Sequence, residues 1–373
     1  MEWEADGAGA HGGNSDNMSG RKIIYQSDAV QVVLRAAKPR RNNLVITFTP
    51  AIEKGNEKPK RGFGEYFLSN RGYDVLCFIS TENHWWQVPE MESALQAAEA
   101  ICSNYANISG YGVSMGAYGL LMYSRRLGID KILAIVPQVT VDPSKPPFEI
   151  RWADFAKRIN FQNDDLNAGL NASSRVTFVY DPLFQDRKHI DLIDAKIQNT
   201  FPVTFMRHAA SRYLQRLGIL ETLVIDLLED RLDLNSLMRR LRHSRKLDRE
   251  FWFWLVKTCL DRGRDRWALK FAHDIRSRND LHLDDLLDLN KTFRKLRDFR
   301  GLAECHRRIY QLNLDNSARD AAVSYYLRLW RSNTDIDQVQ MIATLESANV
   351  SLKSREIRVL LRRLSRRNAQ PAA

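Results

Sequence analysis

The chain has 373 residues, of which 44% are hydrophobic, and its formal net charge at pH 7 is +11. This length favours two domains, and the apolar content is enough for a full core. The four cysteines stand far apart and form no Cys-x-x-Cys pair, which argues against a metal site and a disulfide scaffold and fits a reducing compartment. No apolar run approaches the length that spans a membrane.

The charge is unevenly distributed along the chain. Residues 1–210 hold equal numbers of basic and acidic side chains, and residues 211–373 hold the whole positive excess. This asymmetry predicts two parts with separate roles. Residues 1–20 are acidic and glycine-rich, without a basic-then-apolar leader pattern, so we expect a disordered tail and a cytoplasmic protein.

Apolar runs separated by polar turns predict strands and helices in alternation up to residue 210. Several runs are continuous and β-branched, which is typical of strands buried on both faces of a sheet. The predicted strands are Lys22–Gln26, Val30–Arg35, Leu44–Thr49, Tyr73–Ile79, Asn107–Tyr111, Lys131–Val136, Arg175–Tyr180 and Pro202–Met206. The predicted helices are Glu65–Asn70, Met91–Tyr105, Ala117–Arg126 and Arg187–Gln198, with two short ones around Trp152–Ile159 and Asp165–Leu170. The pattern predicts an α/β domain with a mostly parallel sheet wrapped by helices.

From residue 211 onward the predicted strands stop and helices follow one another. Leu260, Gly263 and Ala268 have the spacing of a tetratricopeptide-type hairpin, and Leu296 and Ala303 repeat the first and last of them after about 35 residues. We therefore expect an all-α, tetratricopeptide-like domain over residues 217–373. The predicted helices are Ile219–Leu228, Leu234–His243, Arg249–Leu260, Asp265–Arg276, Leu283–Leu296, Gly301–Leu312, Ala318–Trp330, Asp335–Leu345 and Ser354–Arg366.

The segment Gly112-Val113-Ser114-Met115-Gly116 lies between a predicted strand and a predicted helix. A serine flanked by glycines two residues away on each side is typical of a strained strand-to-helix turn that exposes a nucleophilic hydroxyl. A side chain at Gly112 or Gly116 would collide with neighbouring backbone. The N–H groups of the following helix point to the place where an oxyanion would form.

A serine nucleophile needs a base to accept its proton and a carboxylate to orient that base. His208 follows the last predicted strand, and Asp181 follows the strand before it. Both therefore belong to the carboxyl edge of the sheet, as does Ser114. Asp186 lies in the same loop as Asp181 and is the alternative acid, although it is also the better candidate to cap the next helix.

With these residues the chain resembles the α/β-hydrolase family of serine esterases and lipases. The resemblance covers Ile23 to Gly218 and rests on Gly112-Val113-Ser114-Met115-Gly116, Asp181-Pro182-Leu183-Phe184 and His208. It implies an α/β-hydrolase domain over residues 21–216. Within that domain it implies Ser114 as nucleophile, His208 as general base and Asp181 as orienting carboxylate, with Asp186 as the alternative.

The family's oxyanion hole uses the N–H after the nucleophile, here that of Met115, and one from the loop after the third strand. That loop here is Thr49-Pro50-Ala51 and lacks the His-Gly motif of the family. Because proline has no N–H, the resemblance favours Ala51, with Thr49 as the alternative.

His84, Trp85 and Trp86 follow a predicted strand at the same edge of the sheet. Two adjacent indoles beside polar groups could form a substrate-facing wall for an acyl chain or a sugar face. The alternative is a loop packed on the core.

The combined pattern predicts a serine hydrolase that cleaves a carboxylic ester of a small molecule or a glycan, without a cofactor or a metal. The basic helical domain suggests docking to an acidic protein partner, while nucleic acid is the weaker alternative. A catalytically inactive scaffold with the hydrolase fold is the competing hypothesis.

Overall fold

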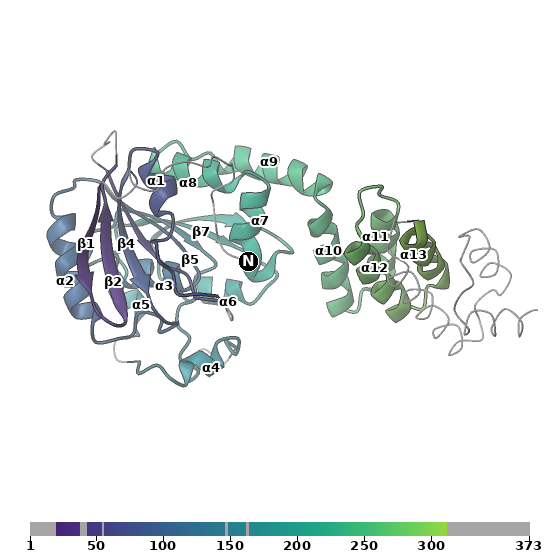
Figure 1. Ribbon diagram of the computed structural model, residues 1–373, viewed down its shortest axis with the longest axis horizontal. Coiled ribbons are helices and arrows are strands. Elements are labelled where there is room, and N and C mark those ends of the chain that lie inside the picture. The colour runs from purple at the N-terminus through teal and green to yellow at the C-terminus, as the bar shows by residue number, and fades with distance from the viewer. Residues whose placement is uncertain (1–19, 38–42, 54–55, 146–147, 162–163, 312–373) are drawn as a thin grey trace, which may run out of the picture. The chain divides into compact units, whose positions relative to one another are not determined.

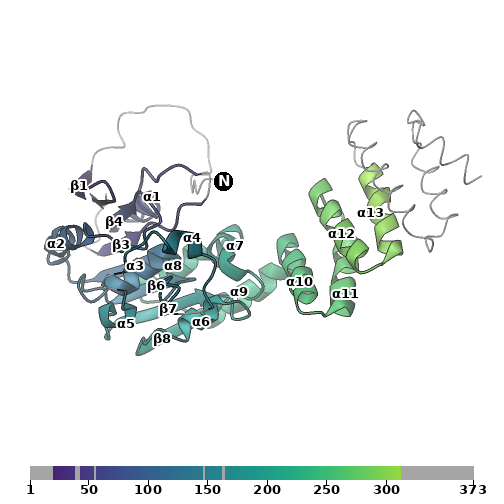
Figure 2. The same cartoon turned by 90° about the horizontal axis from the view of Figure 1, so that it is seen from below.

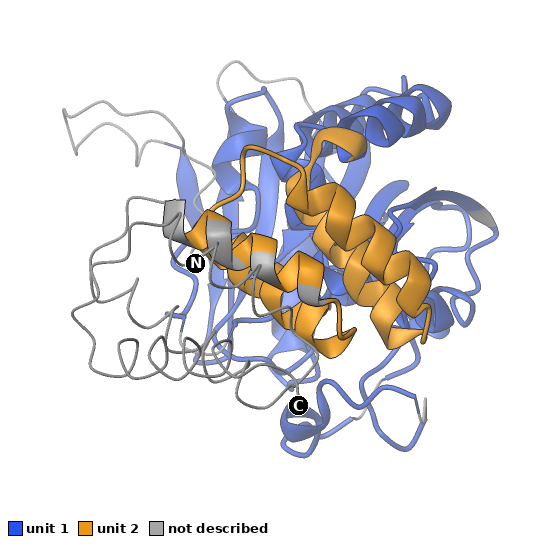
Figure 3. Ribbon diagram, turned by 90° about the vertical axis from the view of Figure 1, so that its right-hand side faces the viewer, with its two compact units in different colours: residues 1–245 blue, residues 246–373 orange. Residues whose placement is uncertain are grey.

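The structure, a computed structural model, describes residues 20–37, 43–53, 56–145, 148–161 and 164–311. The chain divides into two compact units, residues 1–245 and 246–373 (Figure 3). The division falls inside α9 (Leu234–Leu247) and therefore later than the predicted boundary at residue 216.

The first unit is built on an eight-stranded sheet with helices packed against it (Figures 1 and 2). The strand order is β1-β2-β4-β3-β5-β6-β7-β8; β1, β2 and β4 pair antiparallel, and all other neighbours are parallel. The strands are β1 (Arg21–Gln26), β2 (Val30–Arg35), β3 (Leu44–Phe48), β4 (Asp74–Ser80), β5 (Ile108–Val113), β6 (Lys131–Ile135), β7 (Arg175–Tyr180) and β8 (Ile197–Pro202). The helices are α1 (Glu65–Ser69), α2 (Met91–Cys102), α3 (Met115–Tyr123), α4 (Ala153–Ala156), α5 (Leu166–Gly169), α6 (Asp186–Ile190), α7 (Ala210–Arg216) and α8 (Leu220–Leu228). The predicted fold class, a mostly parallel sheet with helices followed by a helical region, is confirmed.

Burial along the strands explains why the sequence pattern predicted them well. Every residue of the central strands β3 and β4 is buried, as expected for continuous apolar runs in a parallel sheet covered on both faces. The edge strand β1 is only half-buried.

The other edge of the sheet differs from the prediction. A long helix was expected over Arg187–Gln198, but α6 ends at Ile190 and β8 begins at Ile197, before the predicted strand at Pro202. The reason is that β8 pairs only with β7 and exposes its polar residues 198–200. A polar edge strand lacks the apolar run by which the inner strands were recognised.

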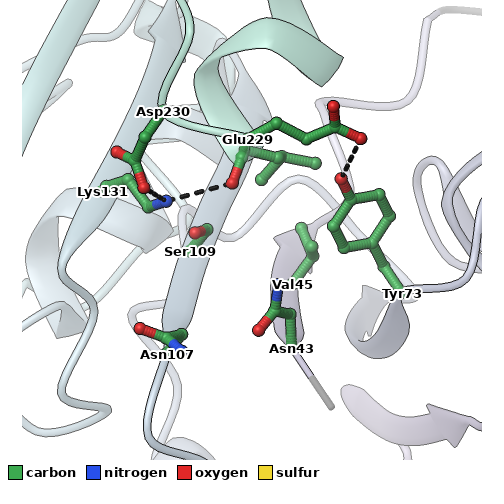
Figure 4. Close-up of a pocket in the computed structure, with 9 residues that line it drawn as sticks. Asn43, Val45, Tyr73, Asn107, Ser109, Lys131, Glu229 and Asp230 are labelled. Carbon is green, nitrogen blue, oxygen red and sulfur yellow. Dashed lines mark hydrogen bonds and ion pairs between the residues drawn. The ribbon is translucent and has the colours of Figure 1, made fainter. Parts of the chain in front are cut away.

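Helix α8 is tied to the amino ends of the parallel strands, opposite the edge that carries Ser114. Lys131 Nζ lies 2.8 Å from Asp230 Oδ2 and donates to the Leu228 carbonyl at 3.0 Å, and the Tyr73 hydroxyl lies 3.3 Å from Glu229 Oε1 (Figure 4). These contacts enclose a polar cavity of about 220 Å³ between the end of α8 and the starts of β3, β5 and β6. They also explain why α8 belongs to the first unit.

The described part of the second unit consists of helices packed through small and apolar side chains. Ala268 and Ala272 are fully buried in its core with Leu286 and Phe293. The helices are α10 (Arg249–Asp261), α11 (Asp265–Arg276), α12 (Leu283–Lys295) and α13 (Phe299–Gln311). The helices predicted beyond residue 312 lie outside the described residues, and the tetratricopeptide likeness stays a prediction. Within the described residues, no helix combines the length and the apolar character needed to cross a membrane.

The amino end of α3 lies against the carboxyl end of β3 without room for a side chain between them. A Cβ added at Gly116 would lie 2.2 Å from the Phe48 carbonyl oxygen, and one at Gly119 would lie 2.7 Å from the Phe48 ring. Since real Cβ atoms do not approach a backbone oxygen this closely, a side chain at Gly116 would push the helix away from the strand.

We expect Gly116→Ala to lower the free energy of unfolding by about 3 kcal/mol, because the added methyl group overlaps rigid backbone. Urea unfolding of wild type and variant measures this. Gly263→Asn is the control, since Gly263 has a φ of +64° with nothing near its side-chain position and asparagine tolerates this region. A Gly116→Ala protein as stable as wild type would contradict the close packing.

Candidate active site

Ser114 occupies the turn between β5 and α3 in a strained conformation. Its φ of +53° and ψ of −121° lie outside the regions that ordinary residues populate. The turn is secured by a hydrogen bond of 2.9 Å from the Ser114 N–H to the Ile135 carbonyl of the adjacent strand. Its side chain is largely buried, with 6% of the residue exposed. The strand-to-helix turn predicted from the glycine spacing is therefore present.

His208 lies on a short 3-10 helix, Arg207–Ala209, that follows β8. Its Nε2 is 3.0 Å from Ser114 Oγ, and its Nδ1 is 3.0 Å from Asp186 Oδ2. Three polar groups that are far apart in the sequence thus form one continuous hydrogen-bonded row. In this row the serine hydroxyl can donate to Nε2 while Nδ1–H donates to the carboxylate.

The carboxylate beside His208 belongs to Asp186, the alternative acid, and not to Asp181, which the sequence reasoning favoured. Asp181 instead accepts hydrogen bonds from the backbone N–H groups of Leu183 at 2.9 Å and Arg207 at 2.8 Å. It therefore ties the loop after β7 to the segment that carries His208. Burial raises the pKa of Asp181 above its ordinary value despite these backbone hydrogen bonds.

Three polar side chains, two buried and one partly exposed, lie behind Asp186, and the sequence reasoning missed them. Arg151 NH1 forms an ion pair of 2.7 Å with Asp186 Oδ1, and Arg151 Nε donates to Glu149 Oε1 at 3.0 Å. Glu149 Oε2 lies 2.8 Å from Nε2 of His189, which is fully buried. Arg151 and Glu149 come from a polar, irregular stretch in which no sequence signal marked them.

Two of these carboxyl groups have lowered pKa values. Burial by itself raises the pKa of Asp186, but the hydrogen bond with His208 and the positive charge of Arg151 outweigh it, so the pKa falls below the ordinary value. Burial likewise opposes ionisation of Glu149, and its hydrogen bonds with His189 and Arg151 lower the pKa to about 2. Both groups are therefore carboxylates at neutral pH.

The two predicted oxyanion donors, the N–H groups of Met115 and Ala51, belong to the start of α3 and to the loop after β3. Met115 is the first residue of α3, and an N–H in the first turn has no acceptor within its own helix. In the loop after β3, the Thr49 N–H donates to the Phe78 carbonyl at 3.0 Å, and the Ile52 N–H donates to Asn83 Oδ1 at 2.6 Å. Between these two, Pro50 has no N–H, so Ala51 stays the candidate donor of this loop that the sequence favoured.

The predicted substrate-facing wall is not present in this structure. Trp85 and Trp86 are 0% exposed, and His84 is buried. The Trp86 indole N–H donates to the Met115 carbonyl at 2.9 Å, and its ring packs edge-on against Phe48. The alternative, a loop packed on the core, describes these residues, because the Trp86 indole lies beside α3 and the Trp85 ring packs against Trp152 and Phe155.

Gln138 also lies beside Ser114, and the sequence reasoning did not identify it. It follows β6 and is fully buried, with Oε1 3.4 Å from Ser114 Oγ and Nε2 donating to the Val136 carbonyl at 3.1 Å. Val136 has a φ of +45°, which is strained for a β-branched residue. The signal available in the sequence was its position just after a strand that ends at the same edge of the sheet.

Comparisons with known proteins concern the fold. No protein-family model and no curated protein sequence matches this chain. Among solved structures, the capsule O-acetyltransferase of Neisseria meningitidis serogroup A is 12% identical with a TM-score of 0.40, over 56% of this chain and 97% of that one. Est1E from Butyrivibrio proteoclasticus is 10% identical with a TM-score of 0.39, over 57% of this chain and 100% of that one. A putative esterase from Staphylococcus aureus is 11% identical with a TM-score of 0.39, over 55% of this chain and 82% of that one.

The strand order describes a mostly parallel eight-stranded sheet with helices, followed by a helical region. At TM-scores of 0.40 and below, the likeness to these solved structures carries no conclusion about this chain, and their activities are not transferred to it. Among the residues that the structure describes, no group of three or more His, Cys, Asp or Glu side chains could hold a metal ion.

The lowered pKa values predict how stability responds to acid. Because the pKa of Glu149 is about 2 in the folded chain and 4.5 as its ordinary value, its carboxylate stabilises the fold above about pH 4.5. That stabilisation is lost as the pH falls from 4.5 toward 2, and the lowered pKa of Asp186 acts in the same direction.

We expect Glu149→Gln to lower stability at pH 7 by about 2 kcal/mol and to flatten its decline between pH 4.5 and 2. Urea unfolding across this pH range measures both effects. Asp154→Asn removes an 89% exposed carboxylate from the same stretch and should leave both nearly unchanged. An unaltered pH dependence in Glu149→Gln would refute the assignment.

Proposed function

We propose that the protein is a serine hydrolase that cleaves a carboxylic ester, with Ser114 as nucleophile, His208 as general base and acid, and Asp186 as the carboxylate that orients His208. The observation that carries the proposal is the hydrogen-bonded row of these three side chains, with 3.0 Å between partners at both steps. A strained serine held within reach of an oriented imidazole is the arrangement that nucleophilic acyl transfer requires.

In the proposed reaction, His208 Nε2 takes the Ser114 proton as Oγ attacks the ester carbonyl carbon. The N–H groups of Met115 and Ala51 hold the resulting oxyanion. The imidazolium then protonates the leaving alcohol as the carbon–oxygen bond breaks, which leaves an acyl-serine. His208 then takes a proton from a water molecule as the water oxygen attacks the acyl carbon. The bond between this carbon and Ser114 Oγ breaks, His208 returns the proton to Oγ, and the carboxylic acid departs.

The helical second unit has the role of docking to an acidic partner in this proposal. The support is the charge of the second unit, since residues 246–373 hold 26 Lys and Arg against 17 Asp and Glu, and a basic surface attracts acidic partners. We propose a small-molecule or glycan ester as the substrate, bound at the carboxyl edge of the sheet, where open α/β sheets bind ligands.

We expect wild type to react with a fluorophosphonate probe and to hydrolyse a p-nitrophenyl ester, and Ser114→Ala to lose both. The variant removes the only oxygen that can form the acyl intermediate, so turnover should fall by at least about 10³-fold. Labelling and hydrolysis by a folded Ser114→Ala protein would remove the assignment. A folded wild type that neither labels nor hydrolyses a panel of short and long esters would favour the inactive scaffold.

The two aspartates give a matched pair of variants. We expect Asp186→Asn to lower kcat by about 10²–10⁴-fold, because a carboxamide cannot hold the imidazole in the required tautomer. Asp181→Asn should keep kcat within about tenfold of wild type, since its contacts are to backbone N–H groups and one amide oxygen can still accept. The reverse order of the two effects in steady-state kinetics would return the acid role to Asp181.

A further inference from the structure

Asp186 is placed by a helix too short to hold itself in position. Helix α6 has five residues, Asp186–Ile190, and its N-cap residue Gln185 makes no side-chain capping bond. Because helix nucleation is unfavourable, a single turn of this kind depends on tertiary contacts for its stability. The position of the carboxylate beside His208 therefore depends on what holds α6.

Two side chains from the stretch between β6 and β7 contact one face of this helix. Arg151 pairs with Asp186 at 2.7 Å, and Glu149 lies 2.8 Å from His189. Asp186 and His189 are three residues apart and thus lie on the same side of the helix. Ile150, which lies between these two residues in the sequence, is 75% exposed. Glu149 and Arg151 therefore both face the helix, while Ile150 faces solvent.

All three nitrogens of the Arg151 guanidinium take part in these contacts. Its Nε and NH2 groups face the two oxygens of Glu149, and NH1 pairs with Asp186 Oδ1. The guanidinium carbon also lies 5.3 Å from the centre of the Phe184 ring. All three nitrogens of this guanidinium therefore contact side chains of the protein itself, which fits a positioning role.

The two oxygens of Asp186 have separate partners. Oδ1 pairs with Arg151, and Oδ2 faces His208 Nδ1 at 3.0 Å. Arg151 NH1 is also 3.2 Å from that same Nδ1; because arginine only donates, the Nδ1–H required by the proposed reaction must bond to the carboxylate. Anchoring Oδ1 leaves Oδ2 in the orientation that receives this proton.

We propose that Glu149 and Arg151 are positioning residues that hold α6 and orient the Asp186 carboxylate toward His208. This inference rests on the proposed function for its kinetic consequence, but the geometry it describes can be measured without any substrate. Trp152, the next residue, packs edge-on against the His208 ring with 5.9 Å between ring centres. The same short stretch, residues 149–152, therefore contacts both the acid and the base.

The first test compares Arg151→Gln and Arg151→Lys with wild type in steady-state hydrolysis of p-nitrophenyl butyrate. We expect Arg151→Gln to lower kcat by about 10- to 100-fold, the effect of a misplaced group near the reacting atoms, while KM changes less than about threefold. Arg151→Lys should recover part of kcat, because an ammonium keeps the ion pair with Asp186 but cannot also bridge to Glu149. Thermal unfolding confirms that each variant is folded at the assay temperature.

Lys157→Gln is the matched control, because Lys157 is a 73% exposed cation of the same stretch paired with Asp154. It should leave kcat unchanged. The inference is overturned if folded Arg151→Gln keeps the wild-type kcat, if only KM rises, if Arg151→Lys recovers nothing, or if Lys157→Gln loses as much activity.

A second test separates this inference from the proposed function. An imidazole N–H bonded to a carboxylate gives a far-downfield proton resonance in NMR spectra, and His208→Gln assigns it. We expect the resonance in wild type and Lys157→Gln, and its loss in folded Arg151→Gln. If wild type hydrolyses no ester but this pattern appears, the proposed function fails and the positioning role stands. Absence of the resonance from wild type, or its persistence in Arg151→Gln, overturns the positioning role.

Discussion

The close contact between the amino end of α3 and the carboxyl end of β3 determines where the rest of the site can be. A hydrogen atom in place of a side chain at Gly116 lets the helix rest on the Phe48 carbonyl. The strained backbone of Ser114 and the first N–H groups of α3 are thereby brought next to the loop after β3. The turn that carries Ser114 and the Met115 N–H are thus backbone features that lie beside this contact.

The remaining parts of the site come from loops at the same edge of the sheet, and buried polar contacts hold these loops in place. Asp181 joins the loop after β7 to the segment that carries His208 by accepting two backbone N–H groups. Arg151 and Glu149 join the long stretch between β6 and β7 to helix α6. Burying charged or polar side chains is costly unless each is paired. The buried side chains of Glu149, Asp186 and His189 meet that condition through contacts with one another, with His208 and with the partly exposed Arg151.

For the two aspartates after β7, position in the sequence does not predict which one lies beside His208. Asp181 directly follows the strand, where a family pattern would place the acid, but its oxygens are occupied by backbone donors. Asp186 begins the next helix, where an acidic residue is also expected from helix electrostatics alone. The path of the loop decides which of the two faces His208, and the ion-pair partner of Asp186, Arg151, lies 35 positions before it in the printed sequence.

The sequence by itself determined the class of fold and the strand-to-helix turn at Ser114. Both are local properties: continuous apolar runs specify strands buried on both faces, and glycines two residues on each side of a serine permit a turn that other residues would block. The partners of Ser114 at the carboxyl edge followed from chain order, because parallel strands all end at that edge.

The tertiary structure alone decided the rest. In the folded chain Asp186, and not Asp181, lies beside His208, and Trp85 and Trp86 are buried in the core. Four residues that no sequence pattern marked also lie at the site: Gln138, Arg151, Glu149 and His189. The boundary between the two units falls after α8. The physical reason is the same in each case. These outcomes depend on contacts between side chains that are distant in the sequence, and no local pattern of polarity or propensity records which distant groups will meet when the loops close over the edge of the sheet.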